Sequence, residues 1–524
     1  MKQPIRKTAT GRQPVKKSAV EKTREISQKE VKPPIKEKAP AAKTPASTAK
    51  KKVAKKATTR SAPKKPTPPK DPPPGSKKKV PKRAAVRKRS PKKSAATAPA
   101  LKAVASLAVM ASGVAASGGE PTFAAELSSA AHARAKTKKP RLLWIGDALV
   151  PTGFATVTHS ILDHLRRDWE VVVSGVNYDG SPHDLPYRVM PAWQGGDMWG
   201  MNRFRDLCTE FAPAAVIINN DWWNVAEFAQ LAPKGLPVIG YMPVDGGHLN
   251  PAAIQELNRL HAAIWYTEFG HREAVKAGFK GKRHVITHGI DTGVFHPMNQ
   301  AEARRLLDLN LPRNTFVVGN PNRNQPRKRL DLTIGIFADW IRRHGVTDAF
   351  LLLHCAQKDT GWDLRRVAEY HGVANKLLLT GGDAIRDLQS TSHLRLIYSS
   401  LDVQMSTTLG EGWGLTTMEG MACGIPQLVP DSAALAEWAE PAVKIPCSRL
   451  LMNPEINTTG ALVDHEPFVE ALEELYRDRL TRNEISACGL KHVRQDRFSW
   501  SAVARQFNAV LRTTRLTSAR RARV

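Results

Sequence analysis

The chain has few cysteines, and their spacing excludes two common kinds of site. The five are Cys208, Cys355, Cys423, Cys447 and Cys488. They stand singly, without the paired spacing that holds zinc, and their odd number leaves at least one outside any disulfide. We therefore expect no structural zinc and a reducing, cytoplasmic setting.

Long apolar runs are also missing. The best candidate, 103–116, is too short and too poor in Leu and Phe to span a bilayer, and it lies too far into the chain for a signal peptide. We expect no transmembrane segment and interpret 101–139 as an Ala-rich linker. A segment that touches a membrane is the alternative.

Acidic residues are scarce in the first quarter of the chain. Residues 1–140 hold 37 of the 79 Lys and Arg residues but only 7 of the 48 Asp and Glu residues, so they carry +30 of the formal net charge of +31. Residues 1–100 are rich in Lys, Ala, Pro, Ser and Thr and have too little apolar surface to offset the entropy of ordering. This composition predicts a disordered basic tail followed by an almost neutral globular part.

The tail also contains a sequence pattern that indicates what it binds. The segment Ser90-Pro-Lys-Lys93 and its neighbouring Lys, Ala and Pro residues resemble the tails of linker histones. A flexible polycation binds phosphates through counterion release, without reading a base sequence. We expect residues 1–100 to bind DNA or another polyanion. A solubilising tail, or one that binds RNA or acidic lipid, is the alternative.

The remaining ~385 residues suit two domains of ordinary size. Short apolar runs alternate with helical or polar segments, which is typical of parallel sheets. The first series lies at 141–146, 170–175, 214–218, 237–241, 262–266 and 284–287, and the second at 315–319, 349–354, 376–380, 401–405 and 426–430. The pattern predicts an α/β fold of two Rossmann-like domains facing a cleft. We place them at 140–300 and 301–498, with a hinge near 299–312, a C-terminal helix at 499–515 that packs back, and a basic end at 516–524.

A glycine loop with two carboxylates lies in the second half, at Glu411-Gly-Trp-Gly-Leu-Thr-Thr-Met-Glu419. The two glycines let the backbone approach a ligand, and the apolar spacing predicts a helix from about Leu415, whose first amides would face an anion. Glu411 then precedes the helix and Glu419 lies about one turn inside it, so both carboxylates can reach one cleft and bind vicinal hydroxyls. An ordinary Gly-rich turn before a core helix is the alternative.

Four segments together resemble a known family. They are 285–297, 319–331, 411–426 and 498–504, and they occur in the order found in the large retaining GT-B glycosyltransferases, the group that includes glycogen and sucrose synthases. The resemblance covers about residues 140–515. It implies transfer of a sugar from a nucleoside-diphosphate sugar, UDP- or GDP-linked, to an acceptor hydroxyl with retention of the anomeric configuration. It also implies that no metal is required, and the chain contains no Asp-x-Asp segment.

The resemblance assigns roles to single residues. Glu411 matches the residue that holds the hydroxyls of the donor sugar, and Glu419 the one that holds the nucleotide ribose. Arg323 and Lys328 match a pair of cations that neutralise the diphosphate leaving group, a task suited to preorganised positive charge. A solvated basic loop is the alternative for these two.

Further donor-binding positions lie on loops. The backbone at Gly412, Trp413, Gly414, Leu415 and Thr416 would face the sugar and phosphates, and Gly153 matches the glycine of a loop in the first half that would face the same diphosphate. A plain turn is the alternative for Gly153.

Two departures from the family bear on the site. Asn220 stands where many relatives have a histidine, which puts a histidine contact to the sugar in doubt. Gly412 replaces a common proline, which is expected to loosen the loop.

The acceptor side is expected on first-half loops, where Asp245 and His248 follow a strand. Either can touch the acceptor hydroxyl or serve only as a turn residue. Trp222 and Trp223 can stack on an acceptor, although core packing suits them better.

Several functions follow. The first is a glycosyltransferase that acts on hydroxylated bases in DNA, with the tail as a tether. The second is a glycan or small-molecule glycosyltransferase whose tail only attaches it to nucleic acid or an anionic surface. The third is a nucleic-acid-binding protein on an inactive transferase scaffold. A glycosidase is disfavoured, because its two carboxylates must flank one bond.

Overall fold

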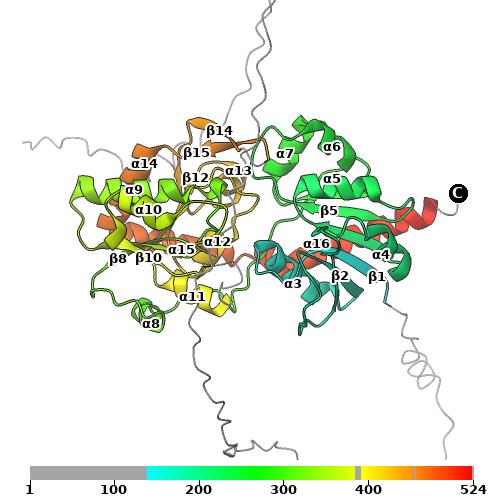
Figure 1. Ribbon diagram of the computed structural model, residues 1–524, viewed down its shortest axis with the longest axis horizontal. Helices are drawn as coiled ribbons and strands as arrows, with labels where there is room; N and C mark the ends of the chain where they lie inside the picture. Colours follow the sequence, from blue (N-terminus) through cyan, green and yellow to red (C-terminus); the bar gives the residue numbers. More distant parts are fainter. Residues whose placement is uncertain (1–138, 384–390, 454–455, 522–524) are drawn as a thin grey trace, which may run out of the picture. The chain divides into compact units, whose positions relative to one another are not determined.

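A computed structural model describes residues 139–383, 391–453 and 456–521. This part contains two parallel sheets, each covered by helices (Figure 1). The predicted basic tail 1–100, nearly all of the predicted linker 101–139 and residues 522–524 lie outside the described residues.

The first half is built on a seven-stranded sheet in the order β3-β2-β1-β4-β5-β6-β7. The strands are β1 (Arg141–Asp147), β2 (Glu170–Val176), β3 (Arg188–Pro191), β4 (Ala215–Asn219), β5 (Val238–Met242), β6 (Ala262–Trp265) and β7 (His284–Val285). The helices are α3 (Gly153–Leu165), α4 (Phe204–Phe211), α5 (Trp222–Leu231), α6 (Pro251–Leu257) and α7 (Glu268–Lys276). Every residue of β4 and β5 is buried, because helices cover both faces, and this produces a continuous apolar run instead of an alternation.

The second half is built on a six-stranded sheet in the order β10-β9-β8-β11-β12-β13. The strands are β8 (Phe316–Asn320), β9 (Ala349–Leu353), β10 (Leu377–Leu379), β11 (Val403–Met405), β12 (Gln427–Pro430) and β13 (Val443–Ile445), and a hairpin adds β14 (Arg449–Asn453) and β15 (Thr458–Leu462). The α-helices are α8 (Gln300–Leu306), α9 (Leu330–His344), α10 (Leu364–Tyr370), α11 (Thr391–Ser399), α12 (Leu415–Ala422), α13 (Ala433–Trp438), α14 (His465–Arg477) and α15 (Arg479–Val493). Short 3₁₀ turns are η1 (Pro326–Lys328), η2 (Ala374–Lys376) and η4 (Asp496–Phe498).

Both sheets reverse their strand order at the first strand. β1 lies between β2 and β4, and β8 lies between β9 and β11, with all neighbours parallel. In such sheets the crevice at the carboxyl end of the reversal point is where ligands bind. The predicted fold of two Rossmann-like domains is confirmed, and each sheet supplies one such crevice.

The segment 299–312, predicted as a hinge, is partly helical. This segment contains α8, whose first turn is capped by Asn299, with its Oδ1 accepting from the Glu302 amide at 3.1 Å. Arg304 on α8 then pairs with Asp402 at 2.8 Å and donates to the carbonyl of Ser400 at 2.9 Å. The segment is polar because it is a capped helix on the second half, and not because it is a free linker.

The last helix, α16 (Trp500–Arg521), packs against α3 of the first half. The ring centroid of Phe507 lies 4.8 Å from that of Tyr241 and 6.3 Å from that of Trp144. Trp169 adds a 2.9 Å hydrogen bond from its Nε1 to Oδ1 of Asn508. The chain therefore returns to the first half after completing the second.

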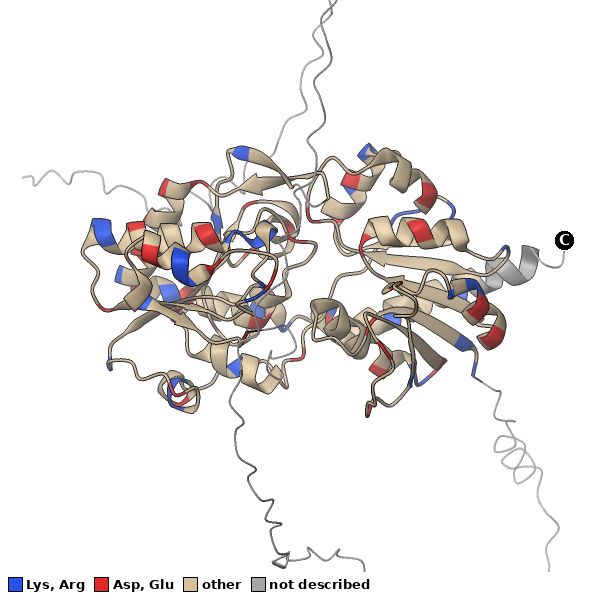
Figure 2. Cartoon of the chain, viewed as in Figure 1, with Lys and Arg blue, Asp and Glu red and all other residues tan. Residues whose placement is uncertain are grey.

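Charge is mixed over the described part. Figure 2 shows basic and acidic residues interspersed on the helices of both halves, in keeping with the nearly neutral sequence after residue 140. Among the described helices, none has the length and apolarity needed to cross a bilayer.

Candidate functional site

A pocket of about 480 Å³ lies between the carboxyl ends of the two sheets. The first half lines it with the loops that follow β1, β4 and β5, and the second half lines it with the loops that follow β8 and β11. Both reversal points therefore open onto one cavity, which is the position where parallel sheets bind their ligands.

Three basic side chains form part of the second-half wall, namely Arg323, Arg327 and Lys328. They follow β8, where η1 turns the chain and Arg329 takes a left-handed φ of 51° before α9. The hydroxyl of Thr407 lies 2.8 Å from the carbonyl oxygen of Arg329 and so ties this turn to the end of the neighbouring strand β11. The cations thus stand on a turn that the sheet itself holds in place.

Glu411 is the centre of a buried ion-pair network. Its carboxylate accepts a hydrogen bond from Lys328 Nζ and lies 3.4 Å from Arg327 Nη1. Arg327 also reaches the first half, where its Nε lies 3.0 Å from the carboxylate of Asp245. Burial acts to raise the pKa of Glu411, but Lys328 and Arg327 outweigh it and hold that pKa below its usual value. Burial lowers the pKa of Lys328 to about 8 against the opposing pull of Glu411, so the pair is mostly ionised at neutral pH.

Arg323 lines the same pocket, and its guanidinium group is held by an aspartate instead of by Glu411. Its Nε and Nη2 lie 3.0 and 3.1 Å from the two carboxylate oxygens of Asp359. The Asp359 side chain is 4% exposed and that of Arg323 is 37% exposed. The bidentate pair orients the guanidinium group while leaving part of it accessible.

The glycine loop lies tightly between the two halves. Gly414 has a φ of 94°, and a Cβ there would lie 2.7 Å from Leu435. A side chain on Gly412 would collide with Pro243 of the first half. The expectation that Gly412 loosens the loop is therefore wrong, because the loop is held against its neighbour and only glycine fits. As predicted, α12 begins at Leu415, and the pocket is lined by Gly412, Trp413, Gly414, Leu415 and Thr416.

Two further contacts hold this loop. The ring of Trp413 stacks on that of Trp438, with centroids 4.9 Å apart and an angle of 11° between the planes. The hydroxyl of Thr416 lies 3.3 Å from Oδ1 of Asn322, which belongs to the loop after β8. The first turn of α12 is thus attached to the same loop that carries the cations.

Glu419 lies elsewhere. Its carboxylate accepts a 2.5 Å hydrogen bond from the Tyr398 hydroxyl on α11, and it does not line the pocket. Burial raises the pKa of Glu419 to about 7, although the bond from Tyr398 acts to lower it. Of the two carboxylates, only that of Glu411 lines this pocket, because a residue one turn inside α12 lies against α11.

Gly153 lies at the start of α3 and lines the pocket. The preceding Thr152 caps this helix, since its hydroxyl oxygen accepts from the Ala155 amide at 3.1 Å and donates to Asp147 at 2.6 Å. A Cβ on Gly153 would lie 3.2 Å from Leu415, the first residue of α12. Two helix N-termini therefore meet at the pocket, and their first amides suit a bound anion.

The residues predicted for the acceptor side divide between two places. Asn220 and Asp245 line the pocket, whereas His248 does not. The side-chain oxygen of Asn220 accepts from the Asp221 amide at 2.8 Å and from Asn224 at 3.0 Å, so it shapes the loop after β4.

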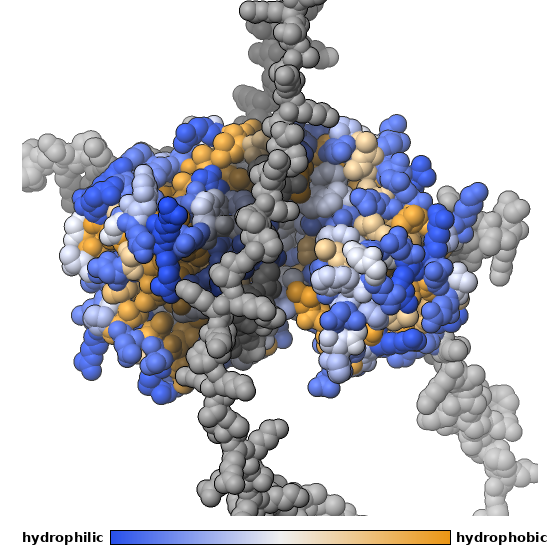
Figure 3. Space-filling view, viewed as in Figure 1, coloured by the Kyte–Doolittle hydropathy of each residue, from blue (hydrophilic) through white to orange (hydrophobic). Residues whose placement is uncertain are grey.

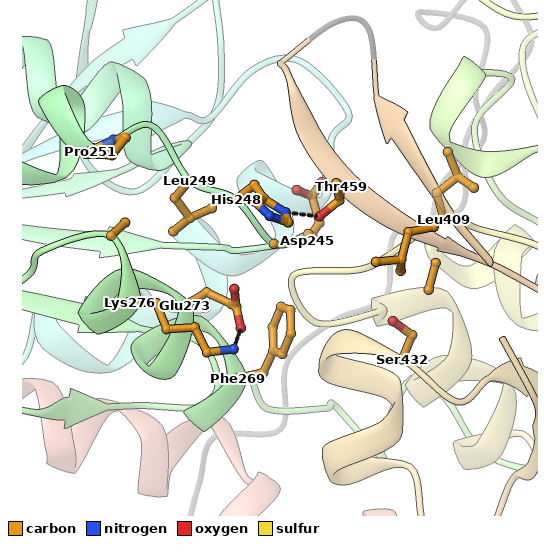
Figure 4. Close-up of a pocket in the computed structure, with 15 residues that line it drawn as sticks. Asp245, His248, Leu249, Pro251, Phe269, Glu273, Lys276, Leu409, Ser432 and Thr459 are labelled. Atoms are coloured by element: carbon orange, nitrogen blue, oxygen red, sulfur yellow. Dashed lines mark hydrogen bonds and ion pairs between the residues drawn. The ribbon is translucent and has the colours of Figure 1, made fainter. Parts of the chain in front are cut away.

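His248 lies in a second pocket of about 540 Å³, between the loop after β5, α7 and the β14–β15 hairpin (Figure 4). Its Nδ1 lies 2.8 Å from the Thr459 hydroxyl, and its φ is 59°. The Lys276 ammonium in this pocket is paired with Glu273 at 2.6 Å. Nearby β14 exposes three apolar side chains (Figure 3), those of Leu450, Leu451 and Met452. The second pocket lacks the cationic wall, so we take the first pocket as the candidate site.

Among the lining residues that sequence reasoning missed are Asp147, Asp221, Arg327 and His288. Two carried a usable signal, because Asp147 directly follows the predicted strand 141–146 and Asp221 lies three residues after the predicted strand 214–218. His288 stands inside the 285–297 segment. Its Nδ1 lies 2.8 Å from the Tyr241 hydroxyl, and burial lowers its pKa to about 3, so it is neutral.

One group of metal-ligand type occurs among the described residues, at Asp339, His465 and Glu466. It lies on α9 and α14, away from the pocket lining. Arg342 and Arg343 each approach Asp339 to 2.6 Å, so basic side chains already balance its charge.

Comparison with known proteins connects this geometry to a family. Residues 271–507 match the family described as Family 4 Glycosyltransferase in conflict systems. Residues 271–507 of this chain are thus similar to a family 4 glycosyltransferase domain. This domain includes Arg323, Arg327, Lys328 and Glu411, and the prediction of a glycosyltransferase is confirmed at this level.

Curated relatives of the family 4 domain are distant. A D-inositol 3-phosphate glycosyltransferase from Thermobispora bispora is 27% identical over 42% of this chain and 48% of the relative. The lipopolysaccharide core biosynthesis mannosyltransferase LpcC from Rhizobium leguminosarum is 26% identical over 43% of this chain and 60% of the relative. The chain thus spans about half the length of the curated relatives it matches.

Solved structures of low identity show the same GT-B fold. A sucrose-phosphate synthase from Thermosynechococcus elongatus has a TM-score of 0.57 at 16% identity, covering 73% of this chain and all of that one. Anabaena HepE in complex with UDP and glucose has a TM-score of 0.56 at 16% identity, covering 71% of this chain and all of that one. The GT-B architecture around the family 4 domain is thereby confirmed.

Proposed function

We propose that this chain transfers a sugar from a UDP- or GDP-sugar to an acceptor hydroxyl, with retention of the anomeric configuration. The observation that carries the proposal is the convergence of Arg323, Arg327 and Lys328 on one cavity with the N-termini of α3 and α12. A departing nucleoside diphosphate gains negative charge, and preorganised cations and amides aimed at that charge lower the barrier. HepE, a structural neighbour, was crystallised with UDP and glucose, which supports a UDP-sugar.

The reaction needs no protein base. The bond between the anomeric carbon and the phosphate oxygen breaks, and a bond from the acceptor oxygen to the same carbon forms on the same face of the sugar. The acceptor proton passes to the departing phosphate oxygen. Arg323 and Lys328 stabilise the charge that remains on the diphosphate, so catalysis rests on charge stabilisation and positioning, and these groups do the work that a metal does in other transferases.

Glu411 is proposed to hold the hydroxyls of the donor sugar. Its two cationic neighbours keep it ionised, and an ionised carboxylate is the strongest hydrogen-bond acceptor for a hydroxyl. Glu419 is proposed to hold the ribose. Tyr398 engages its Oε2, which leaves Oε1 for a ribose hydroxyl.

A glycosidase fits the structure less well. Hydrolysis requires two carboxyl groups on either side of one bond. Of the carboxyl groups that line the pocket, Glu411 and Asp245 are held by Arg327 and Lys328, and Asp147 is held by Thr152 and Asn177. This leaves one carboxyl group, that of Asp221, without a partner among the described residues.

The acceptor is the open part of the proposal. A hydroxylated base in DNA would give the basic tail 1–100 a direct use as a tether. A glycan or small molecule fits the pocket better, because its first-half wall is acidic and would repel a phosphate backbone. A nucleic-acid-binding protein on an inactive scaffold is disfavoured by the intact set of Arg323, Lys328, Glu411 and Glu419. All five cysteines are free, which suits the proposed cytoplasmic location.

The test uses the full chain. Thermal shifts are recorded with UDP, GDP, ADP and their sugars, and sugar transfer is then followed with radiolabelled donor and a panel of glycans, small polyols and hydroxymethylated DNA. We expect one nucleoside diphosphate to raise the melting temperature and its sugar to be consumed. Lys328→Met is expected to reduce donor turnover at least a hundredfold, while Lys276→Met, in the second pocket, leaves it unchanged. If no donor binds, or if both variants behave alike, the proposal fails.

A further inference from the structure

The first-half wall of the pocket carries three carboxylates. Asp147 ends β1, Asp221 follows β4, and Asp245 follows β5. These strands are neighbours in the sheet, in the order β1-β4-β5, so their carboxyl ends form one continuous edge. Three acidic side chains therefore face the cavity from one edge, across from the three cations of the second half.

No Lys or Arg of the first half lines this pocket in the described part of the chain. The first-half histidine that does, His288, is neutral because burial lowers its pKa to about 3. This wall also carries four aromatic side chains, namely Phe154, Trp199, Trp223 and Tyr266. Carboxylates beside aromatic faces suit a molecule with hydroxyl or amine donors and an apolar ring face.

The three carboxylates differ in their hydrogen bonds and ion pairs. Asp147 accepts from Thr152 at 2.6 Å and from Asn177 at 3.1 Å, and Asp245 is paired with Arg327 at 3.0 Å. Among the described residues, no hydrogen bond or ion pair is formed by the carboxylate of Asp221. Burial raises its pKa to about 7. The negative charges of Asp245 and Asp147 also act to raise this pKa, and the positive charge of Arg327 acts to lower it. Asp221 is thus the carboxylate of this wall whose oxygens can still accept hydrogen bonds from a ligand.

The wall is not arranged to hold a single metal ion. Its three carboxylates do not bring their oxygens within 4.8 Å of one another, as the described group Asp339, His465 and Glu466 does. Ligands of one cation must converge on one point.

We propose that the acceptor is a hydroxyl-rich molecule that carries no phosphate where it enters the pocket, that a protonated amine on it is favoured, and that Asp221 sets this preference. This inference rests on the proposed transferase function and assigns the acceptor class of the same site. The physical reason is charge. An acceptor phosphate would meet Asp147 and Asp221 without a first-half cation, since Arg327 is already paired with Asp245. An ammonium group would instead pair with Asp221 and favour its ionised form.

The inference separates this chain from relatives named for a phosphorylated acceptor. Several of them are D-inositol 3-phosphate glycosyltransferases. A cation on the acceptor wall would favour an inositol phosphate, and the first half of this chain supplies none among its described lining residues.

The experiment compares three ligands built on one ring: glucosamine, glucose and glucose 6-phosphate. Their affinities for the full chain saturated with UDP, or with GDP if the thermal screen selects it, are measured by calorimetry. The order is expected to be glucosamine, then glucose, then glucose 6-phosphate, with at least a tenfold difference between the first and the last. Asp221→Asn is expected to reduce this ratio at least threefold. Asp163→Asn, an exposed change on α3, is the matched control and should preserve the ratio.

The two proposals fail in different ways. Absence of nucleotide binding by the unmodified chain contradicts the transferase function. Nucleotide binding with equal affinity for the three rings, including no measurable affinity for any of them, overturns the acceptor inference alone. The same holds if glucose 6-phosphate binds best, or if Asp221→Asn leaves the ratio unchanged.

Discussion

The ion pair between Arg327 and Asp245 joins the second half to the first, and its removal tests whether the two close over the pocket in solution. Arg327 Nε lies 3.0 Å from the carboxylate, and the two side chains are 21% and 16% exposed. At this distance and an effective dielectric constant of about 20, the gross attraction is about 5 kcal/mol. The cost of desolvating both groups offsets much of it, so we expect a coupling free energy of about 1–3 kcal/mol.

The assay is a double-mutant cycle. Free energies of unfolding in urea are compared for the unmodified chain, Asp245→Asn, Arg327→Met and the double variant. Asp245→Asn should cost less than Arg327→Met, because Arg327 keeps Glu411 as a partner while Asp245 would be left without its cation. The exposed pair of Asp163 and Arg166 is the control, with an expected coupling below about 0.5 kcal/mol.

One result would refute the reasoning. If the coupling between Arg327 and Asp245 is no larger than that of the exposed control pair, the bridge contributes nothing in solution. The halves would then not be held together at this point.

Three further predictions concern stability. Gly414→Ala should lower the free energy of unfolding in urea by about 1–2 kcal/mol, because its φ of 94° is unfavourable for a side chain; it should cost more than Gly345→Ala, where a Cβ meets no atom within 4 Å. Glu419 has its pKa raised to about 7, so the stability it adds is full below its unfolded value and is lost as pH rises through 7. Relative to Glu419→Gln, the unmodified chain should lose about 2–3 kcal/mol between pH 5 and pH 8, and a pH-independent difference would contradict this. Glu437→Ala should destabilise the chain by about 1–3 kcal/mol in thermal unfolding, since its carboxylate accepts from two amides at the start of α7, at 2.8 and 2.7 Å; an unchanged melting temperature would show that this cap is not formed.

The central strands were predictable because a strand that is buried on both faces has a continuous run of apolar residues in the sequence. β4 and β5 are buried throughout, and their apolar runs are continuous. β3, β13 and the β14–β15 hairpin were missed, since edge and hairpin strands are partly exposed and have no such run. In β14 four of the five residues are exposed, so its residues resemble a loop in composition.

The sequence by itself determined most of the chemistry of the second-half wall of the pocket. Arg323, Lys328, Gly412 and Gly414 were identifiable from spacing and resemblance, and all of them line the pocket. These positions are local, because each lies on the segment that follows β8 or β11, and the strand carries that segment to the edge of the sheet.

Only the tertiary structure decided which groups meet. It brought Arg327 to Asp245 across the two halves, turned Glu419 toward Tyr398 and aligned Asp147, Asp221 and Asp245 along one sheet edge. These relations join residues far apart in the chain, or depend on which face of a helix packs inward. Composition and spacing report how each segment folds locally, whereas the direction of a side chain across a cavity depends on the packing of the segments against one another.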